Sequence, residues 1–254
     1  MSELYTKVVS AQSVGSDLDL DMYQLLSAHY ACTDFHRFCE DLRAKDSVIL
    51  IFDRALNRLR GFSTIKSVTV TREDGVACRA IYSGDTIIEP AYWGNTALQN
   101  AFLKYLLVEK MKRPFQPLYW FLISKGYKTY LLMANNFSKH YPRYEAETPA
   151  NAQSLMNAYG EAFFGKAYSP ETGLIVFDES LGQLRDGVAE ITDNERKFPR
   201  IAFFESCNPQ WRQGAELACL AELTLDVPFK YVAKLARKTF GRRSLSTRTV
   251  STSR

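Results

Sequence analysis

The chain has 254 residues, of which 46% are hydrophobic, 13% aromatic and 24% charged. This composition excludes collagen-like and intrinsically disordered proteins, and the length allows one large domain or two small ones. No apolar run reaches the roughly 18 residues of a membrane span, and residues 1–10 lack the features of a secretory signal. The five cysteines are widely spaced without a CxxC pair, which is typical of reduced thiols. We therefore expect a cytoplasmic protein, either free or held peripherally at a membrane.

The net charge of +4 is unevenly distributed along the chain. All eight charged residues from Phe229 onward are basic, whereas residues 1–228 contain 24 basic and 28 acidic residues. A nucleic-acid-binding protein usually spreads basic residues over its folded surface, so we do not expect nucleic acid as a partner. Residues 229–240 separate apolar from basic side chains, which predicts a basic amphipathic helix for an anionic membrane or an acidic partner. The alternative is a docked terminal helix with one solvated face.

The first half of the chain predicts helices followed by an antiparallel meander of three strands. Apolar periodicity and turn residues define these elements. They are a strand over 4–11, helices over 17–31 and from Thr33-Asp34, and strands over 47–52, 61–70 and 76–89.

The second half predicts alternating helices and strands. The run 117–124 is apolar throughout, as is typical of a strand buried on both faces. The other expected elements are helices over 95–112, 127–136, from Thr148, 208–223 and 228–240, and strands over 173–178 and 200–206. We therefore expect a mixed α/β fold in three parts: a core over 1–146, an extension packed on it over 147–228, and a basic helix with a flexible tail over 229–254.

Four consecutive segments carry a resemblance to a known family. They are a helix ending FCEDLRAKD, a hairpin VILIFD…LRGFSTIKS, a long strand AIYSGDTIIEP, and a loop with helix YWGNTALQNAFLKYLL. Residues 35–125 thereby resemble the GNAT-like N-acyltransferase superfamily. The resemblance implies a GNAT-like mixed central sheet with helices on its faces. It also implies transfer of an acyl group from a thioester carrier to an amine acceptor.

The loop of this chain departs from the family pattern at two positions. The usual pattern places Arg or Gln three residues before the first Gly and Gly or Ala two residues after it, where this chain has Ala91 and Thr96. The departure favours the branch that takes acyl groups from acyl carrier protein, as in autoinducer synthases and N-acyl amino acid synthases. The expected co-substrate is thus acyl-CoA or acyl-phosphopantetheine, without a metal. Acyl carrier protein is then a candidate acidic partner for residues 229–254.

The resemblance places donor binding at the junction of this loop with the following helix. Unpaired N–H groups at a helix N-terminus suit a pyrophosphate, and here the junction consists of Gly94, Asn95, Thr96 and Ala97. Trp93 is predicted to line the acyl or pantetheine channel, or alternatively to wedge between strand and helix. The backbone around Ile87 and Ile88, up to the N–H of Glu89, is expected to contact the donor and polarise the thioester carbonyl.

Acyl transfer to an amine also needs a base and a proton source for the departing thiolate. Alternation along 76–89 predicts a polar patch near the end of this strand, with Glu89 as the first candidate base and Asp85 as the second. Pairing of these carboxylates with arginine is the alternative interpretation. A bulge in this strand is expected to change which face its last residues occupy. Tyr141, or else Tyr130, is the predicted proton donor.

Three residues are predicted to bind the acceptor substrate. Ser83 lies on the polar face of the long strand, and His140 and Arg143 belong to the segment HYPR. Arg143 is expected to bind a carboxylate of the acceptor, because a guanidinium pairs with carboxylates through two hydrogen bonds. A simple Pro-containing turn is the alternative for this segment.

The sequence also raises a metal-site hypothesis and a rival to the enzyme. His29, Cys32, His36 and Cys39 have a spacing that suits zinc on one continuous helix, but the helix start at Thr33-Asp34 interrupts it, so no metal site is expected. The rival to an enzyme is a non-catalytic GNAT-like protein that binds an acyl ligand or a partner and contacts a membrane through its basic segment.

Overall fold

The computed structural model describes residues 3–30, 33–177 and 190–224. The predicted helix over 228–240 and the basic segment over 229–254 lie outside the described residues. Contacts between residues divide the chain after Glu222 into one large compact unit and a second, C-terminal unit. Among the helices of the described residues, none has both the length and the apolar character needed to cross a membrane.

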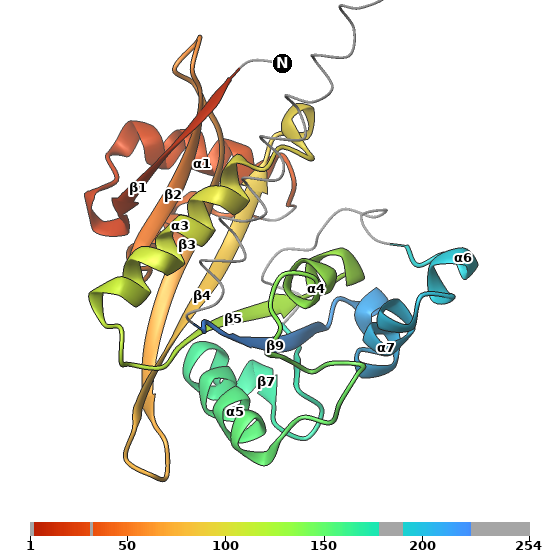
Figure 1. Cartoon of the computed structure of the whole chain (residues 1–254). Coiled ribbons are helices and arrows are strands. Elements are labelled where there is room, and N and C mark those ends of the chain that lie inside the picture. The colour runs from red at the N-terminus through yellow and green to blue at the C-terminus, as the bar shows by residue number, and fades with distance from the viewer. Residues whose placement is uncertain (1–2, 31–32, 178–189, 225–254) are drawn as a thin grey trace, which may run out of the picture. The chain divides into compact units, whose positions relative to one another are not determined.

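A single mixed sheet organises the large unit (Figure 1). Its strand order is β1-β2-β3-β4-β5-β9-β8-β7, with β6 paired to β9. The strands are β1 (Leu4–Ser10), β2 (Ser47–Asp53), β3 (Leu59–Thr71), β4 (Ala77–Ile88), β5 (Leu118–Ser124), β6 (His140–Tyr141), β7 (Tyr168–Ser169), β8 (Leu174–Ile175) and β9 (Glu216–Glu222).

The predicted meander is confirmed. β2, β3 and β4 pair in sequence and antiparallel, and β1 adds to β2 in the same sense. β5 then pairs with β4 in parallel, because the chain crosses back through a helix before β5 begins. The fold is therefore mixed α/β with a central sheet flanked by helices, as the sequence predicted.

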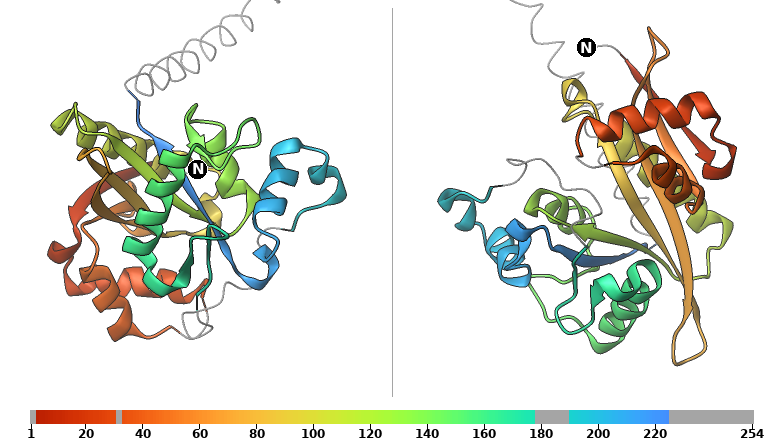
Figure 2. Two further views of the ribbon diagram at one scale, coloured as in Figure 1. Left: turned by 90° about the horizontal axis from the view of Figure 1, so that it is seen from below. Right: turned by 180° about the vertical axis from the view of Figure 1, so that it is seen from behind.

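Helices cover both faces of this sheet. In the front and rear views, α3 and α1 lie on opposite faces of strands β1 to β4 (Figure 1; Figure 2). The α-helices are α1 (Ser16–Ser27), α2 (Phe35–Arg43), α3 (Ala97–Lys112), α4 (Tyr127–Ala134), α5 (Ala150–Phe164), α6 (Asp193–Arg196) and α7 (Pro199–Cys207). Short 3-10 helices lie at Ala11–Ser13, Pro90–Tyr92, Gly165–Ala167 and Trp211–Gln213.

Two predicted helix starts are confirmed. Asp34 caps α2 by accepting a 2.8 Å hydrogen bond from the backbone N–H of Arg37, so His29 and His36 do not share a continuous helix. α5 begins directly after Pro149, which pre-sets its backbone angle and needs no N–H partner there. Among the described residues, no group of three or more His, Cys, Asp or Glu is arranged to hold a metal ion.

Two predicted elements in the last part of the chain are wrong. The run 200–206 forms helix α7 rather than a strand, since Pro199 starts a helix and Ile201 and Phe204 bury one helical side. The run 208–223 contains a short 3-10 turn followed by strand β9 rather than one long helix. β9 lies between β5 and β8, with Leu217–Ala221 buried.

Candidate active site

The central feature of the candidate site is the point where β4 and β5 part. Their parallel ladder begins at Arg79–Leu118 and ends at Tyr82–Phe121. β4 nevertheless continues to Ile88 and β5 to Ser124, each paired thereafter with its other neighbour. Both strands diverge visibly in the front and rear views (Figure 1; Figure 2). Among the described residues, no strand therefore pairs with β4 beyond Tyr82 on the side of β5.

A bulge in β4 lies next to this point, as the sequence analysis expected. The register with β3 shifts between Ser63 and Ile65, so that Thr64 stands opposite both Gly84 and Asp85. The side chains after the bulge therefore change face. Asp85 lies with Thr64, whose hydroxyl is 3.3 Å from the Asp85 carboxylate.

The predicted bases differ in how firmly they are held. Asp85 is 50% exposed and lies 4.0 Å from the ammonium of Lys45. Both carboxylate oxygens of Glu89 accept hydrogen bonds from Nη1 of Arg60, at 3.1 and 3.0 Å. The N–H of Glu89 donates to the carbonyl of Arg60 at 2.9 Å, so this amide is not free to polarise a thioester. Arg60 also stacks over Tyr92, which completes a network that holds the loop after β4.

The predicted donor loop combines engaged and unengaged backbone amides. Gly94 has a φ of +80°, which permits the sharp turn into α3. The N–H of Asn95 donates to the carbonyl of Tyr92, at 3.1 Å, and the N–H of Ala97 donates to Oδ1 of Asn95, at 2.8 Å. The N–H groups of Gly94 and Thr96 have no partner within the described residues. Two of the four predicted amides are thus available to an anion.

The residues that flank the loop take separate positions. Trp93 is 63% exposed and its indole N–H donates to the carbonyl of Ile88 at 2.9 Å, so it is not wedged into the core. Ile87 is buried with Phe62 in the core under α1 and α2. Ser83 points to the other face, where its hydroxyl accepts a 3.2 Å hydrogen bond from the indole N–H of Trp120.

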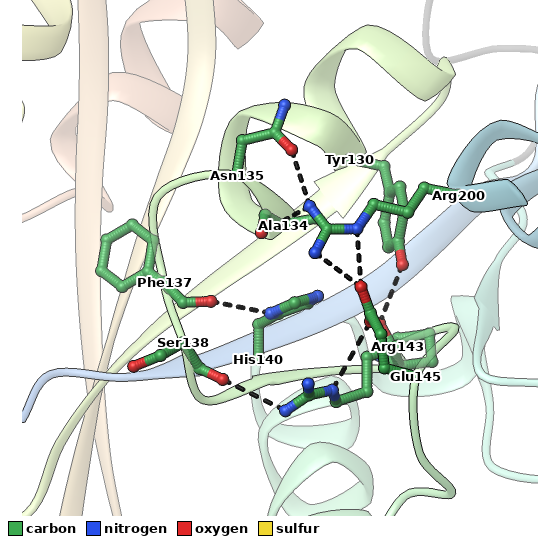
Figure 3. A network of polar contacts seen from close by, with 10 residues as sticks. Tyr130, Ala134, Asn135, Phe137, Ser138, His140, Arg143, Glu145 and Arg200 are labelled. Carbon is green, nitrogen blue, oxygen red and sulfur yellow. Dashed lines mark hydrogen bonds and ion pairs between the residues drawn. The ribbon is translucent and has the colours of Figure 1, made fainter. Parts of the chain in front are cut away.

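The segment around β6 forms a second polar network (Figure 3). His140 is 2% exposed, and its Nδ1 lies 2.8 Å from the carbonyl of Phe137. Its Nε2 is buried and has no hydrogen-bond partner among the residues that the structure describes. Burial lowers the pKa of His140, which keeps the ring neutral at pH 7. Arg143 donates to the carbonyl of Ser138 at 3.1 Å and pairs with Glu145 at 3.6 Å. The carboxylate that Arg143 holds is therefore one of the protein's own.

The same segment does not bring its predicted residues together. His140 pairs with Ala221 of β9 and Tyr141 with Leu220, so their side chains occupy opposite faces of the sheet. Tyr141 packs against the cluster beneath α5, whereas His140 packs against Tyr130. Tyr130, the other predicted proton donor, is fully buried and donates its hydroxyl to the carbonyl of Pro142 at 3.2 Å.

Four titratable residues that the sequence did not indicate lie with Asp85 near the point where β4 and β5 part. Burial raises the pKa of Glu216 to about 7; the ammonium of Lys125 opposes this shift and the carboxylate of Asp85 adds to it. Burial likewise raises the pKa of Tyr82 well above its ordinary value and that of Tyr30 to about 12, with Asp85 and Glu216 adding to both. Charges among these five residues, Glu216, Lys125, Asp85, Tyr82 and Tyr30, thus affect the pKa values of Glu216, Tyr82 and Tyr30. The sequence carried no signal for Glu216, because its segment was predicted to be helical.

The comparisons with known proteins concern the fold. No protein-family model matches the chain, and no curated protein matches it. A conserved protein of unknown function from Enterococcus faecalis V583, described as a probable N-acyltransferase, is 14% identical with a TM-score of 0.40, and the match covers 53% of this chain and 33% of that one. The chain thus spans about one third of that structure's length.

Two acetyltransferase structures are matched over most of their own length. One from Trypanosoma brucei is 15% identical with a TM-score of 0.38, covering 56% of this chain and 96% of that one. A ribosomal-protein-alanine N-acetyltransferase from Brucella melitensis is 12% identical with a TM-score of 0.36, covering 52% and 90%. Each of these matches covers little more than half of this chain. The chemistry of the site rests on its own residues.

Proposed function

We propose that the protein transfers an acyl group from acyl-CoA, or from acyl-phosphopantetheine on acyl carrier protein, to a small-molecule amine. The observation that carries this proposal is the parting of β4 and β5 beside the loop that begins α3. The unpaired edge of β4 beyond Tyr82 suits the amides of a pantetheine arm, as in strand addition to a sheet edge. The free N–H groups of Gly94 and Thr96 suit its phosphates, because helix N-termini bind anions.

The predicted residues take the following roles in this proposal. Asp85 or Glu89 removes a proton from the amine, and Glu89 must first release Arg60 to do so. The backbone at Ile88 contacts the thioester, and Tyr141 supplies the proton to the departing thiolate.

The acceptor side of the proposal concerns three residues. Ser83, His140 and Arg143 bind the acceptor, and Arg143 exchanges Glu145 for a carboxylate of the substrate. Residues 229–254 dock acyl carrier protein or an anionic membrane through their basic side chains. The donor and acceptor thereby approach the parting of the strands from different elements of the chain.

An assay of thiol release tests the proposal. The full chain is incubated with acetyl-CoA, decanoyl-CoA, palmitoyl-CoA or decanoyl-acyl carrier protein and a panel of amino acids, polyamines and lysine peptides. Free thiol is measured with a disulfide dye, and the amide product by mass spectrometry. We expect amine-dependent thiol release with at least one pair. Its absence with every pair favours the non-catalytic alternative.

A matched pair of glycine variants tests the donor loop. Gly94 and Gly75 both have a φ of +80° and open space where an added methyl group would lie, but only Gly94 belongs to the donor loop. Alanine in this conformation costs about 1–2 kcal/mol, so the free loop of Gly94→Ala should leave it. Binding must then restore the conformation, which should raise the KM for the donor about tenfold. Gly75→Ala should leave that KM unchanged. Equal KM values for the two variants would count against phosphate binding at this loop.

A further inference from the structure

Glu216 and Lys125 lie at the open end of β5 and β9. The register that pairs Ser124 with Leu217 places Lys125 beside Glu216, just beyond the last residue of β5. Side chains alternate along β9, so Glu216 occupies the same face as Ala218, which packs in the cluster beneath α5. Glu216 is thus a charged side chain on the face of the sheet that α5 covers.

The β4 residues on this face converge at the bulge. A Cβ atom added at Gly84 would lie 2.6 Å from the hydroxyl oxygen of Thr64 and 3.2 Å from the ring of Tyr82. The glycine therefore allows these two side chains to pack closely against the backbone of β4. The Tyr82 ring also packs against Phe163 of α5, with 5.4 Å between ring centroids. Asp85 lies on the same face, since it accepts a hydrogen bond from Thr64. One side of the strand opening thus carries Tyr82 and Asp85, and the other side carries Glu216.

The three carboxylates near the opening differ in their partners. Both oxygens of Glu89 are bound by Arg60. Asp85 is half exposed and lies near Lys45. Within the described residues, by contrast, no hydrogen bond and no ion pair within 4 Å engages the carboxylate of Glu216. Glu216 is therefore the one of these three carboxylates with neither oxygen engaged by the described residues.

We propose that Glu216, in place of Asp85 or Glu89, is the catalytic base that accepts the proton of the acceptor amine in the acyl transfer. This inference rests on the proposed function and names the residue that would begin the reaction. It also defines the acceptor as an amine that binds as an ammonium ion, with its nitrogen on the face that carries Glu216.

The surroundings of Glu216 suit this role. Its pKa of about 7 allows the carboxylate to accept a proton and to release it near neutral pH. The groups that face it are Lys125 after β5, Tyr82 and Asp85 of β4, and Tyr30 after α1. Burial keeps the two tyrosines protonated, so Asp85 and Lys125 are the charged neighbours. Lys125 lowers the pKa of Glu216 and Asp85 raises it, so the two effects oppose each other and burial is the main cause of the raised pKa.

Atoms and charges balance in this step. The ammonium group gives one proton to the Glu216 carboxylate, and the neutral nitrogen attacks the thioester carbonyl carbon. A C–N bond forms and the C–S bond breaks. The Tyr141 hydroxyl gives its proton to the thiolate sulfur, which leaves as free thiol, and regains a proton from the nitrogen. Glu216 returns its proton to water. The products are an amide, a thiol and one proton.

The pH dependence of kcat/KM for the acceptor tests the proposal, with the donor and amine that release most thiol in the assay above. We expect kcat/KM of the wild type to rise with pH through about 7, as Glu216 loses its proton. Glu216→Gln should lower kcat/KM by about 100-fold or more at pH 8 and remove this rise. Glu216→Asp keeps a carboxylate and should retain a rise with pH at reduced rate.

Two variants serve as comparisons. Glu222→Gln changes a carboxylate on the same strand and the same face, where Glu222 pairs with Lys139 at 3.1 Å, and it should keep the wild-type profile. Glu89→Gln reports on the rival base. Circular dichroism and thermal unfolding of each variant separate loss of fold from loss of the base.

The outcomes distinguish the two proposals. Wild-type thiol release together with an unchanged pH profile in Glu216→Gln overturns the role of Glu216 and leaves acyl transfer intact. The same holds if Glu89→Gln alone removes the rise with pH. No thiol release by the wild type with any pair overturns the proposed function, and the role of Glu216 with it.

Discussion

Gly84 offers the sharpest test of the bulge beside the site. Its φ is not positive, so alanine can adopt the backbone and only the available space matters. An added methyl group would lie 2.6 Å from Oγ1 of the buried Thr64 and 3.2 Å from Cε1 of Tyr82. Overpacking of this kind costs about 1–3 kcal/mol. The lower entropy of the unfolded alanine chain returns about 0.4–1 kcal/mol, so we expect a net loss of about 1–2 kcal/mol.

Urea unfolding of single and double variants measures this effect. Thr64→Ala removes the nearest atom, so Gly84→Ala should cost less than about 1 kcal/mol in that background. Thr64→Val is the matched control, because it keeps the volume of the side chain while it removes the hydrogen bond to Asp85. Gly84→Ala should therefore stay costly beside valine.

Two results would refute this reasoning. If Gly84→Ala is as stable as the wild type, the contacts at the bulge are looser than the structure shows. If valine relieves the cost of Gly84→Ala as well as alanine does, the hydrogen bond rather than the space at residue 64 is responsible.

Three further expectations concern other sites. Burial alone would raise the pKa of Glu109, but hydrogen bonds from its lysine and arginine partners outweigh burial and lower it. Its contribution to stability is therefore complete above the unfolded pKa of about 4.3 and is lost as pH falls through the folded pKa, a loss that Glu109→Gln should remove from urea titrations at acidic pH. The lowered pKa of His140 predicts that its ring protons, followed by NMR, titrate below the ordinary value near 6.5. Gly160→Ala places a methyl group 2.6 to 2.7 Å from three ring atoms of Tyr168 and should cost about 1–3 kcal/mol in thermal unfolding, whereas Gly160→Ala combined with Tyr168→Leu should cost less than the sum of the two single changes.

The first half of the fold was predictable from local signals. Strands β2 to β4 alternate with clear turns, and their pairing partners follow one another directly in the sequence. The start of α2 was visible because Asp34 is a side chain that caps helices well. Such elements depend on residues that are close in the sequence. Whether a segment forms a helix or a strand can therefore be predicted there without the rest of the chain.

The last part of the fold depends on distant contacts. The residues of β9 are mostly Ala, Leu and Glu, which favour a helix when considered alone. Burial between β5 and β8 imposes the strand, and neither neighbour is close to β9 in the sequence. In α7, Pro199 was a local signal for a helix start that outweighs the short apolar run.

The candidate site shows the same division. The loop from Trp93 to Ala97 lies where the motifs placed it, at the start of α3. The pairing of Glu89 with Arg60 joins residues 29 apart in the chain, so the sequence indicates arginine pairing only as a general alternative and does not identify the partner. Glu216 enters the site because β9 crosses to the side of β5. Long-range topology, rather than motif spacing, decides which acids meet there.

The central place of β9 has a consequence for synthesis of the protein on the ribosome. The meander up to β4 can form early, since each strand finds its neighbour within a few tens of residues. β5 must wait until almost one hundred further residues have emerged before its second edge is covered. During that interval the exposed apolar edge of Leu118–Ser124 is open to other nascent chains, so chaperone binding is most needed there.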